Sequence, residues 1–170
     1  MSTDFKKRLL LISTIVVIFM TTIGGYYLIN LKQGPYPASK FISLTYKWGL
    51  GDTLVNSYNS ATGEYQYLNH KDSLVKTKVK LHANNIIFLH SKANELDFWK
   101  LPELIANKNA DLNNKDILHY EMVFNYQGKS KKISFYTNYT DDMAIATAAQ
   151  ALQKLVEQTI DEAEERYSNQ

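Results

Sequence analysis

Two carboxylates, Glu64 and Glu121, are candidates for a general acid and a general base. Glu64 and Glu121 each fall in a short segment of alternating apolar and polar residues, which is typical of a β-strand. A strand holds its side chains firmly, as acid–base chemistry by a pair of carboxylates requires. An isolated Glu on the solvent face of a sheet is the more common arrangement, so an envelope hydrolase that uses Glu64 or Glu121 is the enzymatic alternative and not the leading interpretation.

The other residue types that catalyse reactions or bind metals show no recognisable spacing. The chain has no Cys, which excludes thiol chemistry, disulfides and Cys-based zinc sites. Its histidines are His70, His82, His90 and His119, and no two of them are spaced i, i+4. A Gly-rich phosphate loop, a G-x-S-x-G elbow and an H-E-x-x-H helix are all missing from the sequence. We therefore predict that the protein is not an enzyme and that it has no catalytic residues, no metal and no cofactor.

Two groups of like charge offer surfaces for a binding partner. The first, which we call the lysine row, lies on one side of an alternating segment and consists of Lys76, Lys78 and Lys80. The second lies near the end of the last predicted helix and consists of Glu157, Asp161, Glu162, Glu164 and Glu165. Lysines on a strand also prevent edge-to-edge association, and an acidic helix end is often only a solvated terminus. The net charge of +2 is too small to indicate nucleic-acid binding.

Tyrosines recur on the predicted strand faces. Those on or beside the strands are Tyr46, Tyr58, Tyr65, Tyr67, Tyr120, Tyr126, Tyr136 and Tyr139. A Tyr ring is apolar with a polar tip, so it packs well in a core and also suits an interface. Core packing accounts for most of these rings, and an exposed platform for a carbohydrate or a peptide is the alternative.

The N-terminal part of the chain contains a long uncharged run. Residues 9–31 carry no charge, and as a helix they would extend roughly 34 Å, more than the ~30 Å hydrocarbon core of a bilayer. Lys6, Lys7 and Arg8 come just before the run, and the positive-inside bias would keep that end in the cytoplasm. The pattern predicts a single-pass signal anchor that contacts the lipid bilayer through residues 9–31. A cleaved signal peptide is the alternative.

This anchor leads to a prediction of domain organisation and localisation. Residues 1–8 would form a basic cytoplasmic stub, residues 9–31 the transmembrane anchor and residues 32–39 a linker containing Pro35 and Pro37. Residues 40–170 would then form the folded domain. The protein would lie in the inner (cytoplasmic) membrane, with this domain in the periplasm or outside.

Residues 40–170 show strand patterns first and helical patterns later. Alternation predicts strands at residues 41–48, 53–58, 64–68 and 73–81, followed by a hairpin of residues 119–125 and 132–137. Helical spacing predicts a helix over residues 86–96, capped by Asn84 or Asn85, with a short strand over residues 86–90 as the alternative. A second helix over residues 141–167, capped by Thr140 or Asp141, ends the chain. The predicted fold class is α+β, with an N-terminal single transmembrane helix followed by an antiparallel sheet covered by two helices.

One segment carries a resemblance to a group of known domains. The run Leu96-Asp97-Phe98-Trp99-Lys100-Leu101-Pro102 follows a meander that contains Gly63-Glu64-Tyr65. This order resembles small bacterial envelope domains in which a helix ends in a Phe/Trp-x-Leu-Pro-like segment before a hairpin and a final helix. The resemblance covers about residues 41–165 and implies an architecture, but no activity and no site residues.

These observations give one leading hypothesis about function. We expect a membrane-anchored envelope protein whose domain is a non-enzymatic accessory or binding module that contacts an envelope protein partner. The alternative from another class is a periplasmic immunity or inhibitor protein that neutralises a toxin through its surface charge.

Overall fold

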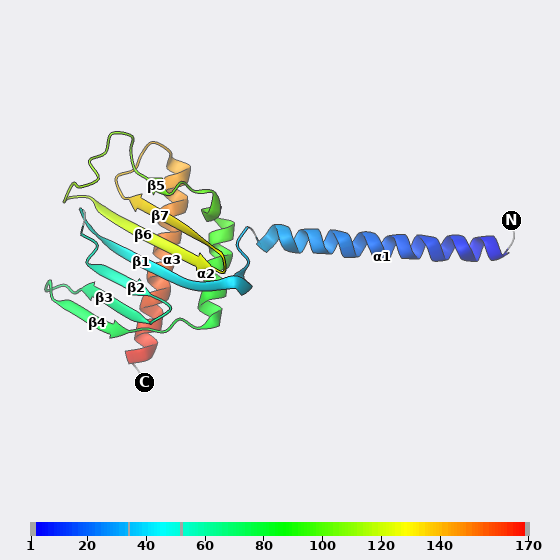
Figure 1. The fold of residues 1–170 in the computed structure, drawn as a ribbon, viewed down its shortest axis with the longest axis horizontal. Helices are drawn as coiled ribbons and strands as arrows, with labels where there is room; N and C mark the ends of the chain where they lie inside the picture. Colours follow the sequence, from blue (N-terminus) through cyan, green and yellow to red (C-terminus); the bar gives the residue numbers. More distant parts are fainter. Residues whose placement is uncertain (1–2, 34, 52, 169–170) are drawn as a thin grey trace. The chain divides into compact units, whose positions relative to one another are not determined.

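A computed structural model describes residues 3–33, 35–51 and 53–168 of the chain. The chain divides into two compact units, residues 1–34 and residues 35–170 (Figure 1). The first unit contains the helix α1 (Thr3–Gln33). The second contains a β-sheet and two further α-helices, and all the residues discussed as functional candidates belong to it.

The prediction of a membrane anchor is corrected by the structure. Among the described residues, no helix combines the length and the apolar character needed to cross a membrane. The side chains of residues 9–10 and 27–31, like those of the preceding basic residues, lie outside the described part. On this finding the transmembrane helix over residues 9–31 and the inner-membrane localisation are wrong. The lipid contact through these residues stays a prediction.

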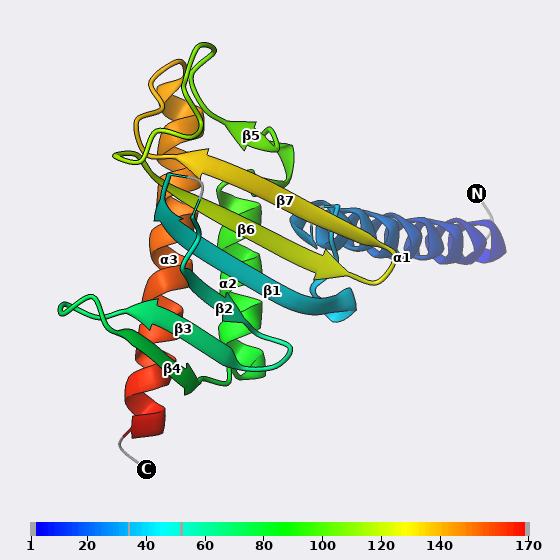
Figure 2. The same cartoon turned by 60° about the vertical axis from the view of Figure 1, so that its left-hand side comes forward.

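The second unit is a two-layer α+β fold. Its sheet has the strand order β4-β3-β2-β1-β6-β7-β5. The strands are β1 (Phe41–Leu50), β2 (Asn56–Asn59), β3 (Glu64–Leu68), β4 (Leu74–Lys78), β5 (Leu104–Ile105), β6 (Leu118–Tyr126) and β7 (Lys129–Tyr136). The helices α2 (Ala83–Glu95) and α3 (Met143–Ser168) both cover the same face of the sheet (Figure 2). The opposite face, which we call the open face, carries mostly polar side chains.

The sheet is mixed, so the predicted antiparallel sheet is wrong at one edge. β5 pairs in parallel with β7, placing Ile105 beside Phe135, whereas the other strand pairs described are antiparallel. Ile105 is 1% exposed, so this short strand closes one end of the core. A strand of only two residues is too short to show alternation, so the sequence pattern did not predict β5.

In the central strand β1, the side chains that alternation places toward the core are buried, except at the start of the strand. Leu44 and Tyr46 are fully buried, as the alternation predicts. Ile42 is 60% exposed, because the pairing of β1 with β6 shifts register between Phe41 and Ser43. Such a bulge shifts the alternation by one position, so the residue before it, Phe41, takes the inward place. The ring of Phe41 therefore packs edge-on against Tyr126 in place of Ile42.

Both predicted helices of this unit are confirmed, but their caps lie elsewhere. The residue before α2 is His82, whose backbone N–H donates to the Asn85 side chain at 3.1 Å. α3 is capped by Asp142, whose Oδ1 accepts the N–H groups of Ala144 at 2.9 Å and Ile145 at 3.2 Å. The strand alternative for residues 86–90 is excluded because these residues lie within α2.

The hydrophobic core lies between the helices and the covered face of the sheet. Side chains from α3 form one wall, namely Ala149, Leu152, Val156, Ile160 and Ala163. Rings and aliphatic side chains from the sheet form the other, namely Leu44, Tyr46, Met122, Phe124, Ile133 and Phe135. Removing a side chain of this size from water contributes about 1.5–3 kcal/mol, so α3 is fixed across the sheet along most of its length.

Candidate binding cleft

A cleft opens on the covered side of the sheet, where the C-terminal half of α3 passes over β2 and β3. Its volume is about 530 Å³. It is lined by Trp48, Asn56, Tyr65, Tyr67, Leu68, Asn69, His70, Glu157, Asp161 and Glu164. We call it the aromatic–acidic cleft, because rings from the sheet face carboxylates from the helix. Clefts of 300–1,000 Å³ are of the size that admits a small ligand or one large side chain.

One wall of the cleft is a continuous row of aromatic rings. Tyr65 and Tyr67 are two residues apart on β3 and therefore point to the same face. Their ring centroids are 4.8 Å apart, and the centroid of Trp48 is 6.2 Å from that of Tyr65. Trp48 also stacks on buried Tyr46, with centroids 4.7 Å apart. The rings support one another, so this wall is preformed.

The opposite wall is a stripe of three carboxylates on α3. Glu157, Asp161 and Glu164 are spaced i, i+4, i+7, which places them on one side of a helix. The Tyr65 hydroxyl donates to Asp161 Oδ1 at 3.4 Å, and the Tyr67 hydroxyl donates to Glu164 Oε1 at 3.2 Å. These two hydrogen bonds connect the walls and hold the carboxylates near the rings.

The third carboxylate is held by a buried amide. Gln153, which is 3% exposed, donates through Nε2 to Glu157 Oε2 and to the Tyr46 hydroxyl, both at 2.9 Å. A buried amide with this bonding fixes its partners in position. All three carboxylates thus accept hydrogen bonds from neutral groups.

The cleft shifts the acid–base equilibria of its own groups. Partial burial raises the pKa of Asp161 above its ordinary value, and the neighbouring charge of Glu165 raises it further, while the Tyr65 hydrogen bond opposes both. Burial also raises the pKa of Tyr65 and of Tyr67, and the carboxylates beside them add to this. The tyrosines therefore remain protonated hydrogen-bond donors at neutral pH.

The structure brings together only part of the predicted acidic group. Glu157, Asp161 and Glu164 line the cleft, and Glu165 lies beside Asp161 on the helix. Glu162 lines a separate groove of about 220 Å³ between α2 and α3, with Phe88 of α2. The five residues are close in sequence, but the helical rotation of 100° per residue distributes them over two surfaces.

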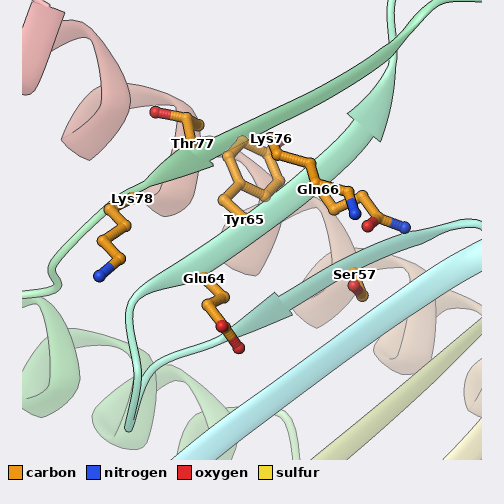
Figure 3. A pocket seen from close by; sticks show the side chains of 7 residues that line it. All are labelled: Ser57, Glu64, Tyr65, Gln66, Lys76, Thr77 and Lys78. Carbon is orange, nitrogen blue, oxygen red and sulfur yellow. The ribbon is translucent and has the colours of Figure 1, made fainter.

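The lysine row belongs to a different surface from the cleft. Lys76 and Lys78 pair with Gln66 and Glu64, and these side chains lie on the open face, whereas Tyr65 between them points to the covered face. Figure 3 shows this part of the open face, where a hollow of about 440 Å³ lies over β2, β3 and β4. Lys80 is exposed beyond the end of β4. The basic and acidic candidates are therefore not brought together.

The two glutamates considered for catalysis also lie on the open face, but far apart. β3 and β6 are separated by β2 and β1, so Glu64 and Glu121 are at least ~14 Å apart at the usual spacing between strands. Paired carboxylates of glycosidases lie roughly 5–9.5 Å apart. Glu121 forms an ion pair with Lys132 at 2.6 Å, and Glu64 accepts a hydrogen bond from Thr62 at 3.1 Å. The structure does not place these two side chains as an acid–base pair.

The histidines are distributed over the fold. His70 lines the cleft, His82 precedes α2, and His90 and His119 are buried at separate places. Within the part of the chain that the structure describes, no group of three or more His, Asp or Glu side chains is arranged to hold a metal ion.

Most tyrosines on the strands are in the core, as the sequence indicates. Tyr46, Tyr58, Tyr65, Tyr126 and Tyr136 are buried, while Tyr67, Tyr120 and Tyr139 are partly buried. Sequence reasoning identified Tyr65, Tyr67 and the acidic residues of the last helix, but it did not place them together. It also missed Trp48 as a cleft residue. The contact between Tyr67 and Glu164 joins residues 97 positions apart, and no local pattern reports such a contact.

No protein-family model matches this chain, and no curated protein matches it.

Proposed function

We propose that residues 35–170 form a non-enzymatic binding domain that receives part of a partner protein in the aromatic–acidic cleft. The observation that carries the proposal is the cleft itself, with preformed rings on one wall and hydrogen-bonded carboxylates on the other. Aromatic side chains in fully formed pockets supply much of the energy at protein interfaces. The neutral donors that hold the carboxylates position them for recognition.

The proposal is tested by site-specific photo-crosslinking in the full-length chain. A photoreactive amino acid replaces His70, which is exposed at the rim of the cleft. A matched variant carries it at Lys76 in the lysine row, and another carries it at Asp111 in an exposed loop. We expect one defined protein adduct from position 70 and little from the other two positions. Replacing Tyr67 with Ala in the same chain should remove most of that adduct.

Two outcomes contradict the proposal. An adduct that forms from position 76 but not from position 70 assigns binding to the open face. Adducts of equal intensity from all three positions indicate nonspecific contact. In either case the aromatic–acidic cleft is not the binding site.

A toxin-neutralising inhibitor is the second candidate function. The stripe of Glu157, Asp161 and Glu164 favours it, because a protein that blocks a basic enzyme needs a complementary acidic surface. Co-expression with the product of the neighbouring gene tests this candidate. Rescue of growth by the unaltered chain, and not by one with Asp161→Asn and Glu164→Gln, supports inhibition.

A further inference from the structure

We propose that the group received by the aromatic–acidic cleft is an organic cation, best represented by the guanidinium of an arginine side chain on a basic partner segment. This inference rests on the proposed binding function and adds the chemistry that the cleft selects. Two features of the cleft support this inference: the aromatic rings of one wall and the negative charge of the opposite wall.

The aromatic wall places the partly buried rings of Trp48 and Tyr67 at the cleft, with the ring of Tyr65, which is 5% exposed, between them. Trp48, Tyr65 and Tyr67 lie side by side at centroid distances of 4.8 and 6.2 Å. A ring face carries partial negative charge, and Trp is the strongest of the natural rings in attracting a cation. A planar guanidinium can stack on such rings while its edge donates hydrogen bonds, which a compact ammonium cannot do.

The acidic wall supplies acceptors whose charge is not compensated. Among the described residues, the ion pairs join other side chains, and none includes Glu157, Asp161 or Glu164. Their hydrogen-bond donors are the neutral groups of Gln153, Tyr65 and Tyr67. Three carboxylates on one helical stripe repel each other, and that repulsion is relieved when a cation enters.

Protonation of Asp161 would remove one of the negative charges that a bound cation needs. Asp161 has a pKa above its ordinary value because it is partly buried and lies near the charge of Glu165. The groups that face it from β3 are the Tyr65 and Tyr67 hydroxyls, and on its own helix Glu157 and Glu164 share the cleft wall. His70, in the segment after β3, also lines the cleft. A bound guanidinium would favour the ionised form of Asp161. Binding should therefore weaken as the pH falls and Asp161 takes up a proton.

A neutral saccharide is the competing occupant, because sugar rings also stack on Trp and Tyr. The two classes differ in their need for charge. A sugar could use the carboxylates as acceptors whether or not it carried a charge, whereas a guanidinium requires the ionised carboxylates. A comparison of a cation with its uncharged isostere therefore separates them.

The experiment uses the full-length chain and follows Trp48 directly. The protein has only two Trp, and the other is Trp99. The indole N–H signals of both can be followed by NMR during titration with a tri-arginine peptide. Tri-citrulline, which has nearly the same shape without the charge, is the matched probe. We expect a saturable shift of the Trp48 signal with tri-arginine, and at least tenfold weaker binding of tri-citrulline.

Variants of α3 show whether the cleft carboxylates are responsible. Asp161→Asn and Glu164→Gln should each weaken tri-arginine binding at least fivefold. Glu162→Gln removes an equal charge from the same helix, but Glu162 lines the other groove. The affinity of this variant for tri-arginine should therefore stay within twofold of that of the unaltered chain. The unaltered dispersion of the remaining NMR signals verifies that each variant is folded.

The inference is overturned if tri-arginine causes no saturable shift of Trp48, if tri-citrulline binds equally well, or if Glu162→Gln weakens binding as much as Glu164→Gln. A shift caused by a chitin or cellulose disaccharide, and not by tri-arginine, also overturns it and assigns a saccharide. The crosslinking experiment at position 70 does not depend on these titrations. The proposal of an arginine occupant can therefore fail while the proposal of a binding cleft still holds, and the reverse is also possible.

Discussion

At the scale of single residues, the described chain contains a buried imidazole with an unsatisfied nitrogen. His119 is 6% exposed and stacks on Tyr136, with centroids 4.7 Å apart and ring planes 6° apart. Its Nδ1 has no hydrogen-bond partner among the described residues. Burial lowers the pKa of His119 below its ordinary value, and the nearby charge of Glu121 opposes this only in part. A protonated ring at this place would lose its hydration without gaining a full counter-charge.

This arrangement makes stability depend on pH in one direction. Because the pKa of His119 is lower in the folded chain, the unfolded chain takes up the proton first as the pH falls below about 6.5. The contribution of His119 to stability is complete at pH values above this range and decreases on acidification. We expect the free energy of unfolding to fall between pH 7.5 and pH 5.5.

His119→Gln tests this expectation, because glutamine does not titrate. Urea unfolding of the unaltered chain and of the variant is compared at both pH values. We expect the variant to lose less stability than the unaltered chain over this interval. Equal losses in the two proteins would show that His119 has the same pKa in the folded and the unfolded chain, and that other groups cause the pH dependence.

At the scale of elements, periodicity was sufficient to locate helices and strands but not their ends or their partners. Helical spacing predicted the helix over residues 141–167, and most of the apolar side chains of α3 between Ile145 and Ile160 lie in the core or pack against it. Its start is fixed by Asp142 and not by Thr140 or Asp141, because a cap depends on which side chain reaches back to the first free N–H groups. The bulge at Phe41 and the two-residue strand β5 were also missed. Each is a local departure from the alternation of side chains, and alternation was the signal that located the strands.

The cap of α3 gives a stability prediction at this scale. Asp142→Ala removes the acceptor for the N–H groups of Ala144 and Ile145, so it should lower the free energy of unfolding by about 1 kcal/mol. Asp142→Asn keeps an acceptor at the same place and should cost much less. Both are measured by urea unfolding at pH 7.5. An equal loss in the two variants would assign the effect to the charge of Asp142 and not to its cap.

At the scale of the whole molecule, the cleft exists because segments distant in sequence meet. Tyr65 and Asp161 are 96 positions apart, and their contact follows from how α3 crosses the sheet. Composition and alternation predicted two helices on a sheet, but the crossing is determined by the packing of Leu152, Val156 and Ile160 on the strands. The candidate residues could therefore be named from the sequence, and the site that they form could not. The membrane prediction was wrong because no helix among the described residues combines the length and the apolar character that a membrane span requires.

The second unit, residues 35–170, should fold without the first unit. The buried residues of the core all lie between Ser43 and Ala163, within the unit formed by residues 35–170. A domain that contains its own core should fold without residues 1–34. A chain of residues 35–170 should therefore unfold in a single cooperative thermal transition, followed by far-UV circular dichroism, and the indole signal of Trp48 should keep its chemical shift. A gradual transition, or a collapsed indole spectrum, would mean that residues 1–34 are required for the core and the cleft to form.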